Sequence, residues 1–168
     1  MGPQRPWRGG REYQDANGRY HGFLWAKGRF TTLDVPGALG SIALGINDRD
    51  QIVGASFDDL SGQPGTVHAF LLDRGRYRGF DAPGKLIPFP LDINDRGQIA
   101  GTGVTADLTT IRPFVLRKGI DGPVTTVAVP GATATSVAGI NDDGDIAGNY
   151  VNPNASPSPS AASRLLAG

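Results

Sequence analysis

One ten-residue segment occurs three times at a constant spacing, and this recurrence constrains the fold more than any other feature of the chain. The copies are Gly45–Gly54, Asp92–Gly101 and Gly139–Gly148. Their shared asparagines lie 47 residues apart, at Asn47, Asn94 and Asn141. Self-similarity at a fixed period indicates a repeat architecture, in which each copy forms the same local structure.

Two further blocks recur in the same order. Asp34–Gly37 returns as Asp81–Gly84 and as Ala128–Gly131, again with a period of 47 residues. His21–Leu24 returns as His68–Leu71 and, three residues early, as Arg112–Val115. We therefore interpret residues 11–151 as a single domain of three tandem repeats, about 19–58, 66–105 and 110–151.

Each repeat predicts two β-hairpins. Apolar residues alternate with small ones in Ser41–Ile46, which is typical of a strand, and Asn-Asp turn chemistry then reverses the chain into Ile52 and Val53. The other hairpin joins Phe23–Trp25 to Phe30–Leu33 through a Lys-Gly turn. The same pattern occurs in Phe70–Leu72 with Tyr77–Phe80, and in Phe114–Leu116 with Val124–Val127.

The composition favours an all-β fold. The 25 glycines and 13 prolines leave little room for helices, because both residues destabilise helix interiors. Four short antiparallel strands in 47 residues match a propeller blade, whose repeats span about 40 to 50 residues. The expected architecture is three four-stranded repeats of β-propeller type, and the structural alternative is a β-solenoid or stacked-hairpin array.

Three blades are too few for a closed ring, since closed propellers have at least about four. We expect either self-association, with two chains making six blades, or a fragment of a longer array. Residues 11–15 predict an extra N-terminal strand that belongs to a missing repeat. Residues 1–10 are expected to be a flexible N-terminus, and the Pro, Ser and Ala residues of 152–168 a disordered tail.

Charge and cysteine content argue against several classes. Lysine plus arginine and aspartate plus glutamate are 16 each, so no net field attracts nucleic acid or an anionic membrane. The absence of cysteine excludes disulfides, thiolate zinc sites and a cysteine nucleophile. No apolar run reaches the roughly 18 residues of a membrane span, and the N-terminus lacks the apolar region of a signal peptide. No membrane insertion and no cofactor are predicted.

The His-Ala-Phe tripeptide at His68–Phe70, with the Gly-Ile-Asn-Asp block and the preceding Pro-Gly, resembles the bacterial HAF-family repeat over roughly residues 11–151. This resemblance implies an extracellular or surface-displayed repeat protein with propeller-like blades and no assigned catalytic residues. The chain departs from the pattern at Arg112–Phe114, which replaces His-Ala-Phe, and at Asp50, which replaces the turn glycine.

Four side chains are candidates for ligand binding. His21 and His68 hold the same position in neighbouring repeats, so a shared hydrogen bond at a strand start is the first interpretation and a shared ligand the second. Trp25 and Tyr77 could stack on sugar rings, although an aromatic residue that ends an apolar run is more often in the core. A glycan or a protein is the expected ligand class.

The acidic turn at Asn141, Asp143 and Asp145 offers the oxygen ligands that calcium prefers. Its glycine, Gly144, stands fourth in the loop, whereas an EF-hand needs glycine sixth. The parallel turns also place arginine among the acids. We therefore interpret these residues as turn formers, with calcium as the alternative, and predict no metal site.

Catalytic motifs are absent: there is no Gly-x-Ser-x-Gly elbow, phosphate loop or His-Glu-x-x-His. The sequence predicts a non-catalytic β-repeat module for recognition or structural assembly. One alternative is a glycan hydrolase that uses two carboxylates near a propeller axis. The other is a fragment of a longer structural array.

Overall fold

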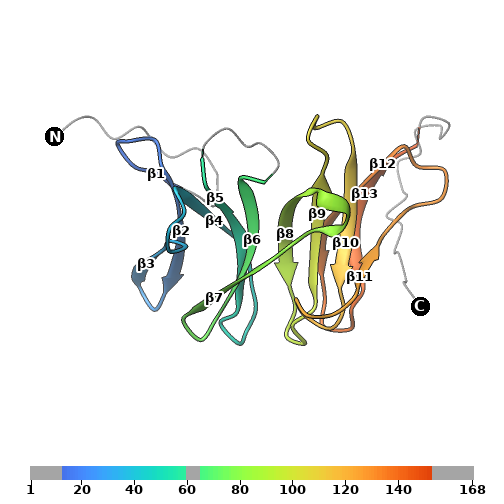
Figure 1. Ribbon diagram of the computed structural model, residues 1–168. Coiled ribbons are helices and arrows are strands. Elements are labelled where there is room, and N and C mark those ends of the chain that lie inside the picture. Colours follow the sequence, from blue (N-terminus) through green and yellow to red (C-terminus); the bar gives the residue numbers. More distant parts are fainter. Residues whose placement is uncertain (1–12, 60–64, 153–168) are drawn as a thin grey trace.

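The computed structural model describes residues 13–59 and 65–152, and this part of the chain is all-β. Four antiparallel sheets follow one another across the molecule in sequence order, from the blue β1–β3 sheet to the orange β12–β13 hairpin (Figure 1). All four sheets are open. The expectations for residues 1–10 and for the tail beyond Asn152 lie outside the described residues.

The N-terminal sheet contains β1 (Tyr13–Gln14), β2 (Tyr20–Ala26) and β3 (Arg29–Leu33). The first four-stranded sheet contains β4 (Gly40–Ile46), β5 (Ile52–Phe57), β6 (Val67–Asp73) and β7 (Arg76–Phe80). The second contains β8 (Ile87–Ile93), β9 (Ile99–Val104), β10 (Ile111–Leu116) and β11 (Val124–Thr126). The C-terminal hairpin contains β12 (Ala134–Ile140) and β13 (Ile146–Val151).

The grouping of strands into sheets differs from the predicted repeat boundaries. Each four-stranded sheet joins the second hairpin of one sequence copy to the first hairpin of the next, because β5 pairs with β6 and β9 pairs with β10. The Pro-Gly segments connect different sheets instead. Proline has no N–H to donate, so Pro36 and Pro83 do not continue a ladder, and the chain crosses to the next sheet there.

Two hairpins turn through residues of positive φ. Lys27 and Gly28 have φ of 50° and 77°, and Arg74 and Gly75 have φ of 50° and 76°. Positive φ at both central residues defines the turn whose twist matches that of the flanking strands, and glycine adopts it without steric cost. The Lys-Gly and Arg-Gly pairs therefore fix the β2–β3 and β6–β7 registers.

Apolar side chains between neighbouring sheets form the core. The central cluster joins the two four-stranded sheets and consists of Val53, Leu71, Ala82, Ile93, Ile99, Phe114 and Leu116. The C-terminal cluster joins the second sheet to the hairpin and consists of Ala100, Val115, Val137, Ile140 and Ile146. The N-terminal cluster is built on Leu33, Ile52 and Phe70, with Leu24, Val35, Ala43, Leu72 and Tyr77 packed against it.

A glycine lies beside a buried phenylalanine in each four-stranded sheet. Gly54 is the register partner of Phe70, and Gly101 is the register partner of Phe114. A Cβ atom would lie 2.6 Å from the Phe70 ring at the first position and 2.7 Å from the Phe114 ring at the second. Only glycine leaves room for these rings, which are 2% and 0% exposed.

Within the described ranges, no helix is long and apolar enough to cross a membrane.

Candidate functional site

The three Asn-Asp turns hold the densest polar network in the described structure. Asn47 Oδ1 accepts the backbone N–H groups of Arg49 and Gln51, at 3.1 and 3.0 Å. Asn94 Oδ1 accepts the N–H groups of Arg96 and Gln98, at 3.1 and 2.9 Å. Each asparagine therefore closes its own turn through its side chain, as the sequence predicts.

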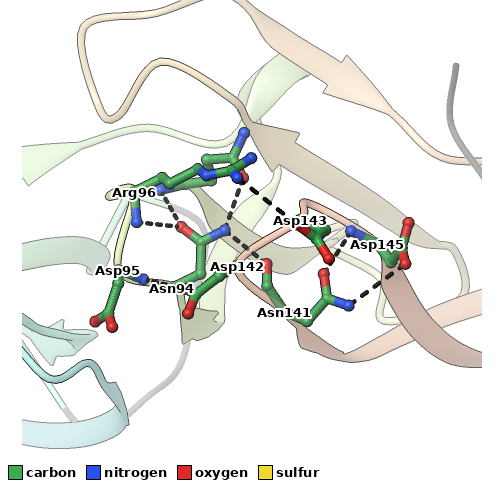
Figure 2. A network of polar contacts seen from close by, with 8 residues as sticks. Asn94, Asp95, Arg96, Asn141, Asp142, Asp143 and Asp145 are labelled. Atoms are coloured by element: carbon green, nitrogen blue, oxygen red, sulfur yellow. Dashed lines mark hydrogen bonds and ion pairs between the residues drawn. The ribbon is translucent and has the colours of Figure 1, made fainter.

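The same asparagines also join one turn to the next. Asn47 Nδ2 donates to the backbone oxygen of Asn94 at 2.8 Å, and Asn94 Nδ2 donates to the backbone oxygen of Asn141 at 2.7 Å. Figure 2 shows the second of these contacts, with the Asn94 side chain directed at the Asn141 turn. One amide thus satisfies its own loop with its oxygen and the neighbouring loop with its nitrogen.

A second row of contacts runs beside the asparagines. The backbone N–H of Asp48 donates to Asp95 Oδ1, and that of Asp95 donates to Asp142 Oδ1, both at 2.8 Å. Hydrogen bonds to an ionised carboxylate are stronger than neutral ones. We call Asn47, Asp48, Asn94, Asp95, Asn141 and Asp142 together the asparagine ladder.

The ladder has a direction. Side-chain amides and aspartate N–H groups donate toward the C-terminal turn, and carbonyl and carboxylate oxygens accept from the N-terminal side. Asn141 Nδ2 contacts Asp145 Oδ2 of its own turn at 3.4 Å, as Asn94 Nδ2 contacts Gln98 Oε1, and no further Asn-Asp turn follows it among the described residues. The C-terminal turn therefore ends the ladder with donors, and the turn at Asn47 begins it with acceptors.

The predicted calcium candidates belong to the last turn of this ladder (Figure 2). Asn141 Oδ1 accepts the backbone N–H of Asp145 at 2.9 Å, and Asp143 lies 3.6 Å from the guanidinium of Arg96 in the preceding turn. In residues 13–59 and 65–152, no group of three or more histidine or acidic side chains gathers as a metal site would require. The geometry is that of a turn held by hydrogen bonds.

The two histidines occupy equivalent places at the starts of β2 and β6. His21 Nε2 lies 3.4 Å from Asp15, and His68 Nε2 lies 3.0 Å from Asp58. His21 also contacts Asp34 through Nδ1 at 2.8 Å. The hydrogen bond to Asp34 raises the pKa of His21 against the opposing effect of burial, and Asp15 raises it further. The structure does not bring the two histidines to one site.

The aromatic candidates lie in different environments. Tyr77 is half-buried and its ring meets Phe70 edge-on, with centroids 5.3 Å apart. Trp25 is 55% exposed, so the expectation that it belongs to the core is wrong. It packs against Phe30, itself 70% exposed, with ring centroids 4.4 Å apart and the ring planes tilted by 51°. The reason is that β2 lies in the outermost described sheet, with no described sheet beyond it.

Trp25 borders an apolar groove of about 430 Å³ between β2 and β4. The groove is lined by Phe23, Leu24, Trp25, Ala43, Leu44, Gly45, Ile46, Ile52 and Asp92. Ile46 is 49% exposed there, whereas its counterparts Ile93 and Ile140 are 3% and 8% exposed. The N-terminal sheet therefore leaves exposed an isoleucine position that the following sheets bury.

Sequence reasoning anticipated the turns but missed the contacts between them. The signal was present, because the aspartates recur with the same spacing of 47 residues as the asparagines. A turn needs only one of these side chains, so a strict recurrence of both indicates a partner outside the turn.

No family model matches the chain, and comparison with curated proteins and with solved structures also gives no match.

Proposed function

We propose that the chain is a non-catalytic β-repeat module that serves recognition or structural assembly. The asparagine ladder carries this proposal. Its amides and carboxylates, the most concentrated polar chemistry of the described residues, join one turn to the next. Side chains used in this way build a scaffold that extends along one direction.

The resemblance to the HAF-family repeat supports the same function. We propose on that basis that the module is exported or displayed at a bacterial surface, and that its sheets are blades of a propeller-like array. The recurrence of strand positions supports the blades: β4, β8 and β12 begin at Gly40, Ile87 and Ala134, and each begins one sequence period after the last. An exposed aromatic pair, Trp25 and Phe30, is the proposed contact for a glycan or protein ligand.

The principal alternative is a glycan hydrolase. Such an enzyme needs two carboxyl groups about 5 to 10 Å apart in distinct environments, one as acid and one as base or nucleophile. Asp95 Oδ1 and Asp142 Oδ1 instead have the same role, since each accepts a backbone N–H from the preceding turn. This equivalence favours a structural use.

A paired assay on insoluble polysaccharides separates these functions. The purified chain is incubated with a panel of glycans, and both retention on the solid and release of reducing ends are measured. We expect no release, and we expect any retention to fall in Trp25→Ala but not in Leu108→Ala, a control in the exposed 105–110 turn. Release that is lost in Asp95→Asn or Asp142→Asn would contradict the proposal and identify a hydrolase.

A further inference from the structure

The C-terminal hairpin exposes a strand that is buried in the other sheets. The strand β13 corresponds to β5 and β9, in which the first five residues are all buried. In β13 only Ile146 is buried, and Ala147, Gly148 and Asn149 are exposed. The reason is that β5 and β9 are covered by β6 and β10, and the described structure has no such strand beside β13.

The N-terminal sheet has the second hairpin of a four-stranded sheet, but its described residues do not include the first hairpin. Its strands β2 and β3 correspond to β6 and β7, which form that second hairpin in the first four-stranded sheet. On the edge of β2 that faces away from β3, the only described partner is the two-residue strand β1, which pairs with Tyr20 and His21 alone. Gly22–Trp25 therefore have no described partner on that edge, and the apolar groove lies beside them.

The clusters of the core show which side chains are missing at the C-terminal end. Phe114 and Leu116 belong to the central cluster and come from β10. The C-terminal cluster has counterparts of most other members, but no residue in the described part of the chain takes the places of these two. The equivalent positions of β2 are Phe23 and Trp25, which are half-buried and exposed.

The N-terminal cluster lacks a different residue. Several of its members repeat those of the central cluster, with Leu24 for Leu71 and Ile52 for Ile99, but among the described residues it has no counterpart of Val53 on β5. The corresponding residue of β13 is Ala147, which is exposed. Each end of the described structure thus exposes an apolar side chain whose counterpart is missing from the described residues of the other end.

The pairing of glycine with phenylalanine repeats this relation. Gly148 is the counterpart of Gly54 and Gly101, but the three atoms nearest to a Cβ built on it belong to Ser136 and Val137 of its own hairpin, and none belongs to an aromatic ring. Phe23 is the counterpart of Phe70 and Phe114. It meets Phe30 edge-on at 5.4 Å, as Phe70 meets Tyr77, but it has no glycine opposite it among the described residues.

We propose that Ile146–Asn149 of β13 in one chain pair with Gly22–Trp25 of β2 in a second copy of this chain, beside the two residues that β1 covers, and so complete a sheet of the order β12–β13–β2–β3. The register of β9 with β10 sets the contacts: Gly148 opposite Phe23, Ala147 opposite Leu24 and Ile146 opposite Trp25. The asparagine ladder continues across the contact, because the Asn141 amide donates to the backbone oxygen of Asn47 in the second copy. This interface continues one that the chain already contains twice.

The contact joins unlike surfaces, so it repeats until a ring closes. Joined in this way, each chain contributes three four-stranded sheets: two of its own and one shared. Two copies give six sheets, which falls within the range of about four to eight in closed rings of this kind. The proposal is therefore a closed pair of chains. It rests on the proposed function and names the partner in the assembly.

Light scattering of the full chain over a wide range of concentrations tests the pairing. We expect a species of twice the chain mass. Ala147→Glu places a carboxylate at a site that is exposed in the single chain and buried in the pair, so it is expected to give a single chain. The matched control, Ala106→Glu in the exposed 105–110 turn, is expected to remain paired. Trp25→Glu is expected to separate the chains from the other end, with Leu108→Glu as its control.

Mixing the two separated variants tests the direction of the contact. The Ala147→Glu variant has an unchanged β2, and the Trp25→Glu variant has an unchanged β13. The mixture is therefore expected to form pairs that neither variant forms alone. Circular dichroism of each variant checks that the strands remain folded.

Three outcomes overturn the proposal: a wild-type chain that is single at every concentration, a pair that survives Ala147→Glu, or a mixture that does not associate. The polysaccharide assay tests the proposed function separately when it is repeated with Ala147→Glu, which separates the chains and leaves Trp25 unchanged. Retention that is lost in Trp25→Ala but kept in Ala147→Glu depends on Trp25 itself and not on the pairing.

Discussion

Replacing Asn94 with alanine is the most informative change to the asparagine ladder. Asn94 is 5% exposed and its side chain makes four hydrogen bonds. Its oxygen accepts two backbone N–H groups of its own turn, and its nitrogen donates to Gln98 Oε1 and to the backbone oxygen of Asn141. At a net value of about 1 kcal/mol for each bond, Asn94→Ala should lower the free energy of unfolding by about 4 kcal/mol.

Asn141→Ala is the matched control, because Asn141 has the same place in an exposed turn. It makes one short bond, from the Asp145 N–H at 2.9 Å, and one long bond to Asp145 Oδ2 at 3.4 Å. The expected loss is about 1 kcal/mol. Asn94→Asp retains the acceptor bonds, but it places a charged oxygen where the amide of the buried Asn94 lies 2.7 Å from the backbone oxygen of Asn141, so its loss should be at least as large as that of Asn94→Ala.

Equilibrium unfolding in urea, followed by circular dichroism, measures these differences. All three variants carry Ala147→Glu, so that self-association does not enter the comparison. Equal losses for Asn94→Ala and Asn141→Ala would refute the reasoning, because the bond between turns would then contribute nothing. A loss near 1 kcal/mol for Asn94→Ala would refute it in the same way.

Three further predictions concern single side chains. Gly101→Ala places a methyl carbon 2.6 Å from a backbone oxygen of the neighbouring strand and should cost about 2 kcal/mol in thermal unfolding. The pKa of His21, measured by NMR, should lie above 6.5 and should return toward that value in Asp34→Asn. The contribution of His21 to stability is therefore fully present below pH 6.5 and is lost as the pH rises through the raised pKa. Hydrogen bonds from Thr105, and then from the backbone of Thr109, lower the pKa of Asp107 to about 2. The contribution of Asp107 to stability is therefore present above pH 3.8 and is lost as the pH falls through about 2. An acid titration followed by NMR measures this pKa.

The strands and turns were predictable because both depend on patterns of residues that are close together in the sequence. Alternating apolar residues predict β4, and glycines of positive φ mark the β2–β3 and β6–β7 turns. The pairing of β5 with β6 was not predictable in this way. A nine-residue connection, 58–66, separates them, and nothing in that segment distinguishes a return to the same sheet from a crossing to the next.

In the candidate site too, contacts within a turn were predictable and contacts between turns were not. Asn47, Asn94 and Asn141 were recognised as turn formers from their side-chain chemistry, whereas their bonds to neighbouring turns depend on how the sheets stack. The exposure of Trp25 also depends on stacking, since the equivalent Leu72 has a sheet on that side and Trp25 has none among the described residues. Local sequence determines what a strand can bury, and its neighbours determine whether it does.

Every strand pair in the described structure joins strands that follow one another along the chain. No pairing brings distant segments together, so the entropy of closing long loops does not delay folding. A chain with this order can complete one sheet before the next has been synthesised. Such a molecule can fold progressively from one end, and a substitution that unfolds a terminal sheet leaves the other sheets folded.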